Sequence, residues 1–351
     1  MICPSLPTLH DKEEVGFYAG KKKSEQAIKL AGIVDEQKQN LLLLMKPVVL
    51  INIMIFFLVI VSDASAAAPK NLDSVGVYWG QDGPEEGTLR SACNTDRYSH
   101  VIVASLTNLG TGRTPKLNFT GHCNPTNYTC NMSDDIRFCQ KSGIKVMLAI
   151  VSDPLSSRDD AKNVSMYLWN NFLSGRSESR PFGDAVLDGI QFMIQQQDLP
   201  YYDDLAKFLS NYNTSTSSSS GNRLYLGAAH PCPTPGSTSM GSAINTALFD
   251  FVSIESSYST TNSRQCDYNG NIGEFMNSWE TWTTMIPAGK IYLGLPASPQ
   301  VAESGFIPAD VLKSEILPVV TKSARFGGVM VWSKFWDDKT GYTDQINTSV
   351  R

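Results

Sequence analysis

The sequence predicts an α/β fold, a closed barrel of eight parallel strands each followed by a helix, and three observations lead to this prediction. After Pro69, short runs of β-branched residues alternate with longer runs of helical periodicity. The strand-like runs number eight, and eight strand-helix units fit the roughly 285 residues that follow, as a (β/α)8 barrel requires. Strands that are joined through helices form right-handed crossovers, which favours a parallel sheet.

The strand candidates fall at regular intervals, at residues 74–79, 100–106, 145–151, 187–195, 224–229, 251–256, 290–295 and 328–332. Four stretches between them have apolar residues three and four positions apart, which predicts helices at residues 159–173, 201–212, 271–285 and 309–322. The last of these follows Pro308, a residue tolerated at a helix start.

The first 66 residues differ from the rest of the chain. Met45-Lys46 leads into an apolar run at residues 48–61, and a small-residue segment ending at Ala66 follows, the pattern of a secretory signal with cleavage after Ala66. We interpret residues 45–66 as a signal peptide, residues 67–351 as a single barrel domain and residues 1–44 as a doubtful N-terminal extension, because secretory signals normally begin a chain. The apolar run is shorter than the roughly 20 residues of a membrane span, which disfavours an anchor in the mature protein.

Composition and charge exclude several classes of function. A hydrophobic content of 42% and a charged content of 18% are typical of a soluble globular protein. The net charge of -5 offers no basic footprint for nucleic acid. His100, His122 and His230 have no ligand partners near them in sequence, so we predict no metal and no cofactor.

Cysteines and sequons agree with secretion. Six of the seven Cys follow Ala66, and an even number behind a signal predicts three disulfides, for which sequence alone permits 15 pairings. Candidate glycosylation sites are Asn118, Asn127, Asn131, Asn163, Asn213 and Asn347. We expect an extracellular protein of the apoplast or cell wall, with the vacuole as the alternative, and a monomer.

The run at residues 187–195 reads Leu-Asp-Gly-Ile-Gln-Phe-Met-Ile-Gln. A strand's period of two places Gln191, Met193 and Gln195 on one face, and Asp188 on the other. In a parallel barrel, the inward-pointing residues at a strand's carboxyl end meet the active site. We therefore predict that Gln191, Met193 and Gln195 line a pocket and that Asp188 is structural.

This run resembles the strand-four motif of family 18 glycoside hydrolases, in particular the plant class III chitinases of the hevamine type. That family has Asp, Asp and Glu at the positions of Gln191, Met193 and Gln195. Supporting runs lie in order at residues 77–81, 121–125, 143–148, 167–173 and 327–335, so the resemblance covers about residues 75 to 349. It implies a TIM barrel and three disulfides, which pair Cys93 with Cys139, Cys123 with Cys130, and Cys232 with Cys266.

The resemblance also implies what the substitutions remove. In family 18 the substrate's own N-acetyl group attacks the anomeric carbon, an Asp steadies that group and a Glu supplies the proton. These two positions are Met193 and Gln195, and a Gln amide has no proton to transfer. Losing general-acid catalysis typically removes about 10² to 10⁴ in rate. We expect a protein with no intact catalytic residue and negligible chitinase activity.

One carboxyl group could replace the missing acid. Glu255 lies near the end of a predicted strand, at a position that the family usually fills with Gln. The family's catalytic Tyr two residues later appears as Ser257, and Tyr258 is displaced by one residue, which points it the other way unless a bulge intervenes. Residues 150–153 replace a glycine-containing run of the family, and we expect their side chains to narrow or reshape the cleft.

Other residues of the sugar site are retained. Tyr78, Gln81 and Trp332 match family positions that line it, and we add Tyr258 as a candidate binding residue. The resemblance further implies a non-proline cis peptide between Trp332 and Ser333, with a second candidate between Ala104 and Ser105.

Several functions fit these residues. The leading hypothesis is an inactive chitinase-like protein of plant defence that either binds chitin or N-acetylglucosamine oligosaccharides as a lectin does, or inhibits a foreign glycosidase such as a xylanase. The alternatives are a weakly active endochitinase that works through Glu255, and a storage protein.

Overall fold

The computed structural model describes residues 72–123, 130, 132–151, 153–194, 199–216, 223–231, 243–256, 268, 270–302 and 304–350. The chain divides into two compact units, Met1–Ala66 and Ala67–Arg351, and all described residues belong to the second. Within the described ranges, no helix combines the length and the apolar character needed to cross a bilayer.

Eight parallel strands close into a barrel, which confirms the predicted fold class. The strands are β1 (Ser74–Trp79), β2 (His100–Thr107), β4 (Lys145–Val151), β5 (Gly189–Met193), β6 (Tyr225–Pro231), β7 (Phe251–Glu255), β8 (Lys290–Pro296) and β9 (Phe326–Trp332). Each pairs with the next, and β1 pairs with both β2 and β9, which closes the barrel. The short β3 (Lys116–Leu117) was not predicted; it adds to β2 in the antiparallel direction.

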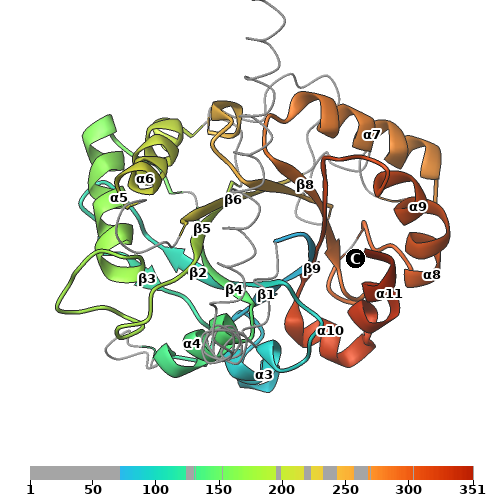
Figure 1. The fold of residues 1–351 in the computed structure, drawn as a ribbon, viewed down its shortest axis with the longest axis horizontal. Helices are drawn as coiled ribbons and strands as arrows, with labels where there is room; N and C mark the ends of the chain where they lie inside the picture. Colours follow the sequence, from blue (N-terminus) through green and yellow to red (C-terminus); the bar gives the residue numbers. More distant parts are fainter. Residues whose placement is uncertain are drawn as a thin grey trace, which may run out of the picture. The chain divides into compact units, whose positions relative to one another are not determined.

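The helices surround this barrel, as Figure 1 shows. They are α3 (Leu89–Cys93), α4 (Ser133–Lys141), α5 (Arg158–Phe172), α6 (Tyr202–Thr216), α7 (Ile272–Met285), α8 (Ala309–Val311), α9 (Leu317–Val320), α10 (Lys334–Thr340) and α11 (Tyr342–Val350). The single helix predicted at residues 309–322 is interrupted by a π-helical turn, Leu312–Ile316. Pro318 explains the interruption, because its nitrogen carries no hydrogen for the bond to the carbonyl of Ser314.

The interior of the barrel is filled by large side chains that lie opposite glycines. A Cβ atom at Gly76 would lie 2.2 Å from Nε2 of the buried His100, and one at Gly227 would lie 2.3 Å from the ring of Phe251. The His100 ring in turn lies 5.6 Å from that of Tyr292, edge to face. The glycines therefore make room for the aromatic packing of the barrel interior.

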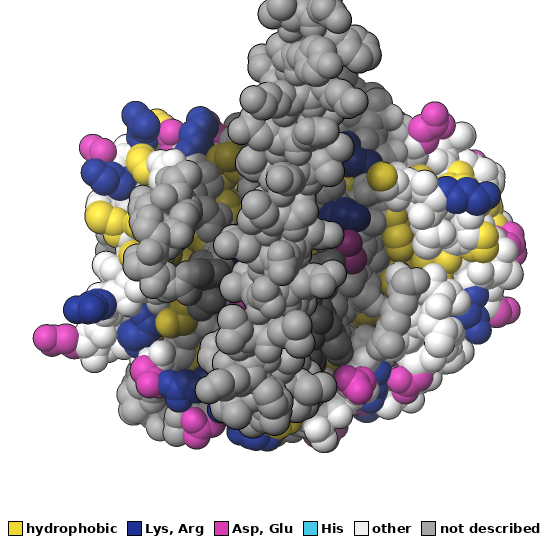
Figure 2. Space-filling model, in the orientation of Figure 1, with side chains coloured by type: hydrophobic (Ala, Val, Ile, Leu, Met, Phe, Trp, Pro, Cys, Tyr) yellow, Lys and Arg dark blue, Asp and Glu magenta, His cyan; other side chains and the backbone are white. Residues whose placement is uncertain are grey.

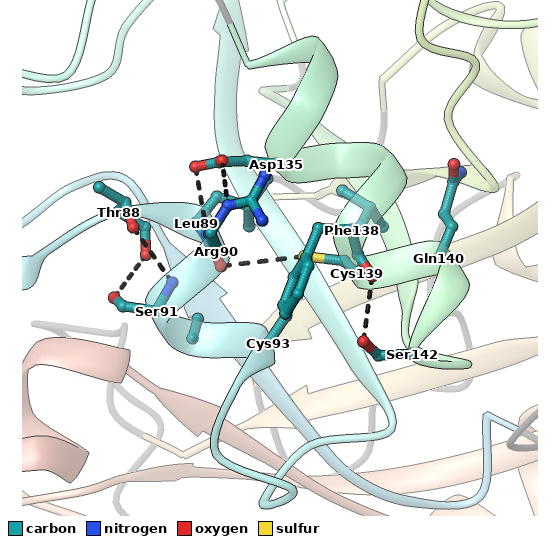
Figure 3. The surroundings of a disulfide bond; sticks show 12 residues. Thr88, Leu89, Arg90, Ser91, Cys93, Asp135, Phe138, Cys139, Gln140 and Ser142 are labelled. Carbon is teal, nitrogen blue, oxygen red and sulfur yellow. Dashed lines mark hydrogen bonds and ion pairs between the residues drawn. A yellow bond between two sulfur atoms is a disulfide. The ribbon is translucent and has the colours of Figure 1, made fainter. Parts of the chain in front are cut away.

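Two of the three predicted disulfides lie among the described residues. Cys93 and Cys139 join α3 to α4 with a Cα–Cα distance of 5.2 Å, and an Arg90–Asp135 ion pair of 3.0 Å braces the same two helices (Figure 3). Cys123 and Cys130 are joined with a Cα–Cα distance of 4.7 Å. The third predicted pair, Cys232 with Cys266, lies outside the described residues.

Candidate functional site at the carboxyl ends of the barrel strands

A chain of buried hydrogen bonds crosses the barrel between β5 and β7. Nε2 of Gln191 on β5 donates to the hydroxyl oxygen of Tyr78 on β1 (3.1 Å), and that hydroxyl donates to Oε1 of Glu255 on β7 (3.0 Å). Ser253 donates to the same Glu255 oxygen (2.7 Å). All four residues are buried, as the alternation of each strand requires of inward-facing side chains.

The carboxyl group of Glu255, at one end of these hydrogen bonds, has an unusual pKa. Glu255 is only 6% exposed, and burial raises its pKa to about 7 against the lowering effect of the Ser253 and Tyr78 hydrogen bonds. Gln191 is 0% exposed, and among the described residues no donor reaches its Oε1 atom. The sequence drew attention to Gln191 and Glu255, but it gave no signal that Tyr78 connects them, because the three residues lie on separate strands.

Two aromatic rings lie at this end of the barrel. Trp332 is the last residue of β9, and its ring centroid lies 5.1 Å from that of Tyr78. The peptide bonds Trp332–Ser333 and Ala104–Ser105 are both cis, as predicted. Met193, the last residue of β5, packs against the group that contains Tyr78, while Gln195 and Tyr258 lie outside the described residues.

The structure corrects part of the expectation for residues 150–153, which run from the end of β4 into the loop after it. Ile150 is fully buried and belongs to the core between the barrel and its helices, because it pairs with the outward-facing Phe192. The prediction that Ile150 narrows the cleft is therefore wrong. Asp153 turns toward the preceding loop, where it accepts a hydrogen bond from the backbone nitrogen of Leu109 (3.0 Å), and Ser152 lies outside the described residues.

Asp153 belongs to a fixed rim, which we define as residues 108–115 and 153–160. The first segment is the loop after β2, and the second runs from the loop after β4 into the first turn of α5. Arg113 lies 3.6 Å from Asp153 and donates to the Pro154 carbonyl (2.9 Å), and Asp160 accepts from the nitrogen of Thr111 (2.7 Å). The two loops are thus joined by charged and backbone contacts.

Gln81 lies just after the end of β1, and its side chain bonds to the backbone of neighbouring segments. Its Nε2 atom donates to the carbonyl of Ala104 (2.6 Å) and to the carbonyl of Asn118 (2.7 Å). The amide therefore ties the end of β1 to β2 and to the segment that follows β3. Asp188 is structural too, as predicted: it accepts from Lys145 (3.0 Å) and from the nitrogen of Val146 (2.9 Å) on the outside of the barrel.

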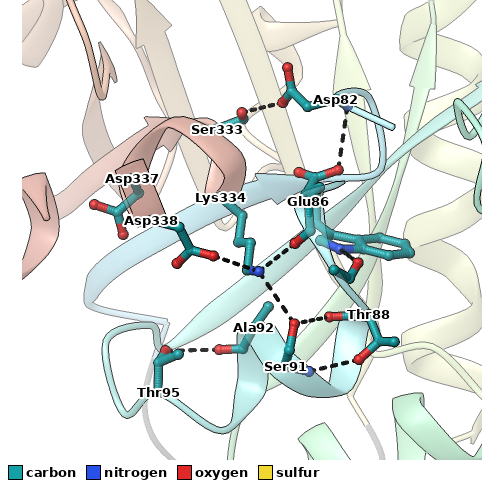
Figure 4. A network of polar contacts seen from close by, with 12 residues as sticks. Asp82, Glu86, Thr88, Ser91, Ala92, Thr95, Ser333, Lys334, Asp337 and Asp338 are labelled. Atoms are coloured by element: carbon teal, nitrogen blue, oxygen red, sulfur yellow. Dashed lines mark hydrogen bonds and ion pairs between the residues drawn. The ribbon is translucent and has the colours of Figure 1, made fainter. Parts of the chain in front are cut away.

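A second polar network lies beyond the ends of β1 and β9, and the sequence did not reveal it (Figure 4). Glu86 is fully buried and accepts from the nitrogen of Gly80 (2.8 Å), while Lys334 donates to its backbone carbonyl and pairs with Asp338 (2.7 Å). Ser333 donates to Asp82, whose pKa is raised by burial. The network holds the loop after β1 against the start of α10.

His122 is not isolated, contrary to expectation, whereas His100 and His230 are buried separately. Nε2 of His122 lies 3.4 Å from Oε2 of Glu86, and its ring centroid lies 4.4 Å from that of Trp79. In the part of the chain that the structure describes, no group of three or more His, Cys, Asp or Glu could hold a metal ion.

The candidate glycosylation sites differ in accessibility. Asn118 and Asn163 are exposed. Asn213 is half-buried, and its side chain donates to the Leu224 carbonyl (2.8 Å) and accepts from the Leu224 nitrogen (2.7 Å). Asn347 is half-buried on α11, and Asn127 and Asn131 lie outside the described residues.

A closed parallel barrel with buried polar groups and aromatic rings at the carboxyl ends of its strands is the architecture of a TIM-barrel enzyme or of a protein descended from one. The model of "Glycosyl hydrolases family 18" matches residues 74–305, and the chain belongs to this family. Its sequence and its structural neighbours identify it more particularly as a plant class III chitinase-like protein.

The relatives include both enzymes and proteins with other names. The chain is 49% identical to "Acidic endochitinase" of Arabidopsis thaliana over 282 residues, which is 79% of this chain and 90% of that protein. The xylanase and alpha-amylase inhibitor protein of Scadoxus multiflorus is 35% identical, with a TM-score of 0.68, 79% of this chain and 98% of that chain covered. The tamarind chitinase-like lectin is 32% identical, with a TM-score of 0.66 and coverage of 78% and 98%.

Proposed function

We propose that this protein is a secreted chitinase-like protein without chitinase activity, which acts in defence by binding N-acetylglucosamine oligosaccharides at the barrel mouth. One observation carries the proposal: β5 ends in Gln191, Phe192 and Met193, with no carboxylate on the strand that should hold the catalytic acids. The family's proton-donor position holds the amide of Gln195, which cannot protonate a leaving group, and the position of its assisting Asp holds the thioether of Met193, which cannot stabilise positive charge at the sugar.

The aromatic and polar groups that remain suit sugar binding. The Trp332 and Tyr78 rings can stack on a pyranose ring, and Gln191 can exchange hydrogen bonds with an acetamido group. Ile150 points away from the barrel interior, which removes one objection to an open mouth. The tamarind relative, named a chitinase-like lectin, has the same fold.

The test is isothermal titration calorimetry with triacetylchitotriose on the purified protein. We expect one site per chain, and Trp332→Ala should abolish it without loss of fold. Val319→Ala is the control, because Val319 is exposed on α9. Absence of heat at millimolar trisaccharide, with the protein folded by circular dichroism, would reject sugar binding at this site.

Inhibition of a foreign glycosidase is the second candidate, and the fixed rim favours it. Loops that are held in place before binding lose less conformational entropy when a partner docks. The related inhibitor of Scadoxus multiflorus is named for xylanase and alpha-amylase. Residual-activity assays with both enzymes test this mode, and Arg113→Ala should weaken inhibition because it releases the rim.

Weak endochitinase activity is a third candidate, favoured by one observation. A buried carboxyl group with a pKa near 7 is what a general acid needs at neutral pH, and Glu255 has this property. Against it, one Glu255 oxygen already accepts from two hydroxyls, and the family's acid comes from β5 instead of β7. A fluorogenic chitotriose assay decides: turnover by the unmodified protein that disappears in Glu255→Gln would establish the enzyme.

Secretion to the apoplast or cell wall follows from the proposed signal at residues 45–66, with the vacuole as the alternative address. N-terminal sequencing of the protein from plant tissue should find Ala67 as the first residue. A mature protein that retains residues 1–44 would contradict this proposal.

A further inference from the structure

The buried chain between Gln191 and Glu255 can run in two directions. A carboxylate only accepts, so with Glu255 ionised Tyr78 must donate to it, and Gln191 must then donate its NH2 group to Tyr78. In this state the carbonyl end of the Gln191 amide is the end without a described donor. The observed geometry has this direction.

Protonation of Glu255 allows the order to reverse. A neutral carboxylic acid can donate its proton to the Tyr78 oxygen, and the Tyr78 hydroxyl then donates to Gln191. Gln191 accommodates this by a half-turn of its terminal amide, which exchanges oxygen and nitrogen at nearly unchanged positions. The NH2 end of the amide now occupies the place that the carbonyl had.

We propose that Gln191 is the residue that recognises the ligand at the barrel mouth, and that Glu255, acting through Tyr78, is a positioning residue whose proton decides which end of the amide the ligand meets. This inference rests on the proposed sugar binding. It also names the favoured ligand chemistry: a group that only accepts hydrogen bonds, such as the carbonyl of an N-acetylated sugar, binds when Glu255 is protonated.

Among the described residues, few other titratable groups lie near Glu255. Besides Tyr78, the described titratable side chains that lie in the barrel interior or pack against it include Tyr292 on β8, Tyr225 on β6 and His100 on β2, all deeper in the barrel. The remaining inward positions near Glu255 carry no titratable group: Gln191 and Met193 on β5, Gly227, Ala229 and Pro231 on β6, Gly294 and Pro296 on β8, and Met330 and Trp332 on β9. Asp82, beyond the end of β1, is turned toward Ser333. Burial, which raises the pKa of Glu255 to about 7, places the change in the accessible pH range.

The first experiment compares two sugars over pH 5.0 to 8.5 by calorimetry. Triacetylchitotriose should bind roughly threefold to tenfold more tightly at the acid end, the factor that one net hydrogen bond provides. Cellotriose has hydroxyls that donate or accept, so its affinity should not follow the same profile. Equal pH profiles for the acetylated sugar in the wild type and in Glu255→Gln would overturn the proposal.

Variants separate positioning from packing. Tyr78→Phe breaks the connection while Glu255 stays in place, so the pH dependence of binding should vanish. Ser253→Ala is the matched control, because Ser253 touches Glu255 without lying between it and Gln191. In this variant the affinity should change with pH by the same factor as in the wild type, but the midpoint of the change should lie at higher pH, since the variant removes a donor that stabilises the Glu255 carboxylate.

A second readout needs no ligand. The side-chain amide signal of Gln191 in a ¹⁵N spectrum, assigned by its absence in Gln191→Leu, should shift with the titration of Glu255 in the wild type and stay constant in Tyr78→Phe. If no sugar binds but the amide signal titrates, the proposed sugar binding fails and the coupling stands. If the signal is independent of pH, the coupling itself is refuted.

Discussion

The deep layer of the barrel interior and the layer at the carboxyl ends of the strands are built on different principles. In the deep layer, His100, Phe251 and Tyr292 pack ring against ring. In the layer above, Tyr78, Gln191 and Glu255 exchange hydrogen bonds, and one acceptor has no described donor. The shapes of the rings decide which side chains the deep layer accepts, and hydrogen bonding decides this in the upper layer. Substitutions should therefore destabilise the two layers for different reasons.

The largest effect is expected from chemistry restored to the upper layer. Met193→Asp with Gln195→Glu returns the two carboxyls that family 18 chemistry needs, and should raise chitinase activity by about 10² to 10⁴ above the unmodified protein. Adding Gln191→Asp and Glu255→Gln removes the relocated carboxyl from β7 and should raise it further. A fluorogenic chitotriose assay measures the change, and the control is the triple variant Met193→Asp, Gln191→Asp and Glu255→Gln, in which Gln195 is unchanged. If a folded variant gains no chitinase activity, the loss of activity has causes beyond these four residues.

The deep layer should respond to added volume. Gly76→Ala places a methyl group against the buried His100 ring, and overpacking of this kind destabilises by about 1 to 3 kcal/mol. Urea unfolding measures the change. The control is Gly273→Ala on α7, where the nearest atom lies 3.3 Å away at the end of an Asn271 side chain and the change favours the helix. Similar stability of the two variants would contradict the idea of a shape-limited layer.

The two layers should also differ in the sign of their pH dependence. Burial lowers the pKa of His100 to about 3 from 6.5, so the unfolded chain binds more protons in that window and His100 reduces stability as pH falls through it. The pKa of Glu255 is raised to about 7 from 4.5, so the folded chain binds more protons there and Glu255 reduces stability as pH rises from 4.5 to 7.

Each slope approaches about 1.4 kcal/mol per pH unit, and the two oppose each other where their windows overlap. Unfolding free energies between pH 4.5 and 6.5 should therefore fall more steeply toward acid in Glu255→Gln than in the wild type, and less steeply in His100→Gln. Parallel curves for all three proteins would show that neither group titrates as its burial requires.

Much of this architecture could be predicted from sequence because it follows from local pattern. The short β-branched runs predicted the bounds of β1 and β4 to the residue, and apolar spacing located α5 and α7. The π-helical turn before α9 was missed because its cause, Pro318, lies inside an otherwise regular apolar pattern.

The site was only half predictable. Alternation identified Gln191 as inward-facing, and the family resemblance drew attention to Glu255. Their link through Tyr78 depends on closure of the barrel, which brings together residues 113 and 177 positions apart. The orientation of Ile150 was misjudged because a comparison of side-chain sizes ignored the period of two: the residue pairs with Phe192, on the outer face of β5. The Glu86 network was missed because its partners come from both ends of the described chain.

The smallest expected effect compares the deep and upper layers most directly, because a tyrosine hydroxyl is removed from each of them. Tyr292→Phe deletes a hydroxyl that donates to the Leu72 carbonyl at the bottom of the barrel, and should destabilise by about 0.5 to 1.5 kcal/mol at every pH. Tyr78→Phe deletes one that both accepts from Gln191 and donates to Glu255, so its cost should change with pH as the carboxyl ionises. Unfolding free energies at pH 5.0 and 8.0 for both variants test this. A cost that varies with pH in Tyr292→Phe, or one that stays constant in Tyr78→Phe, would mean that the two layers do not differ in the way their contacts require.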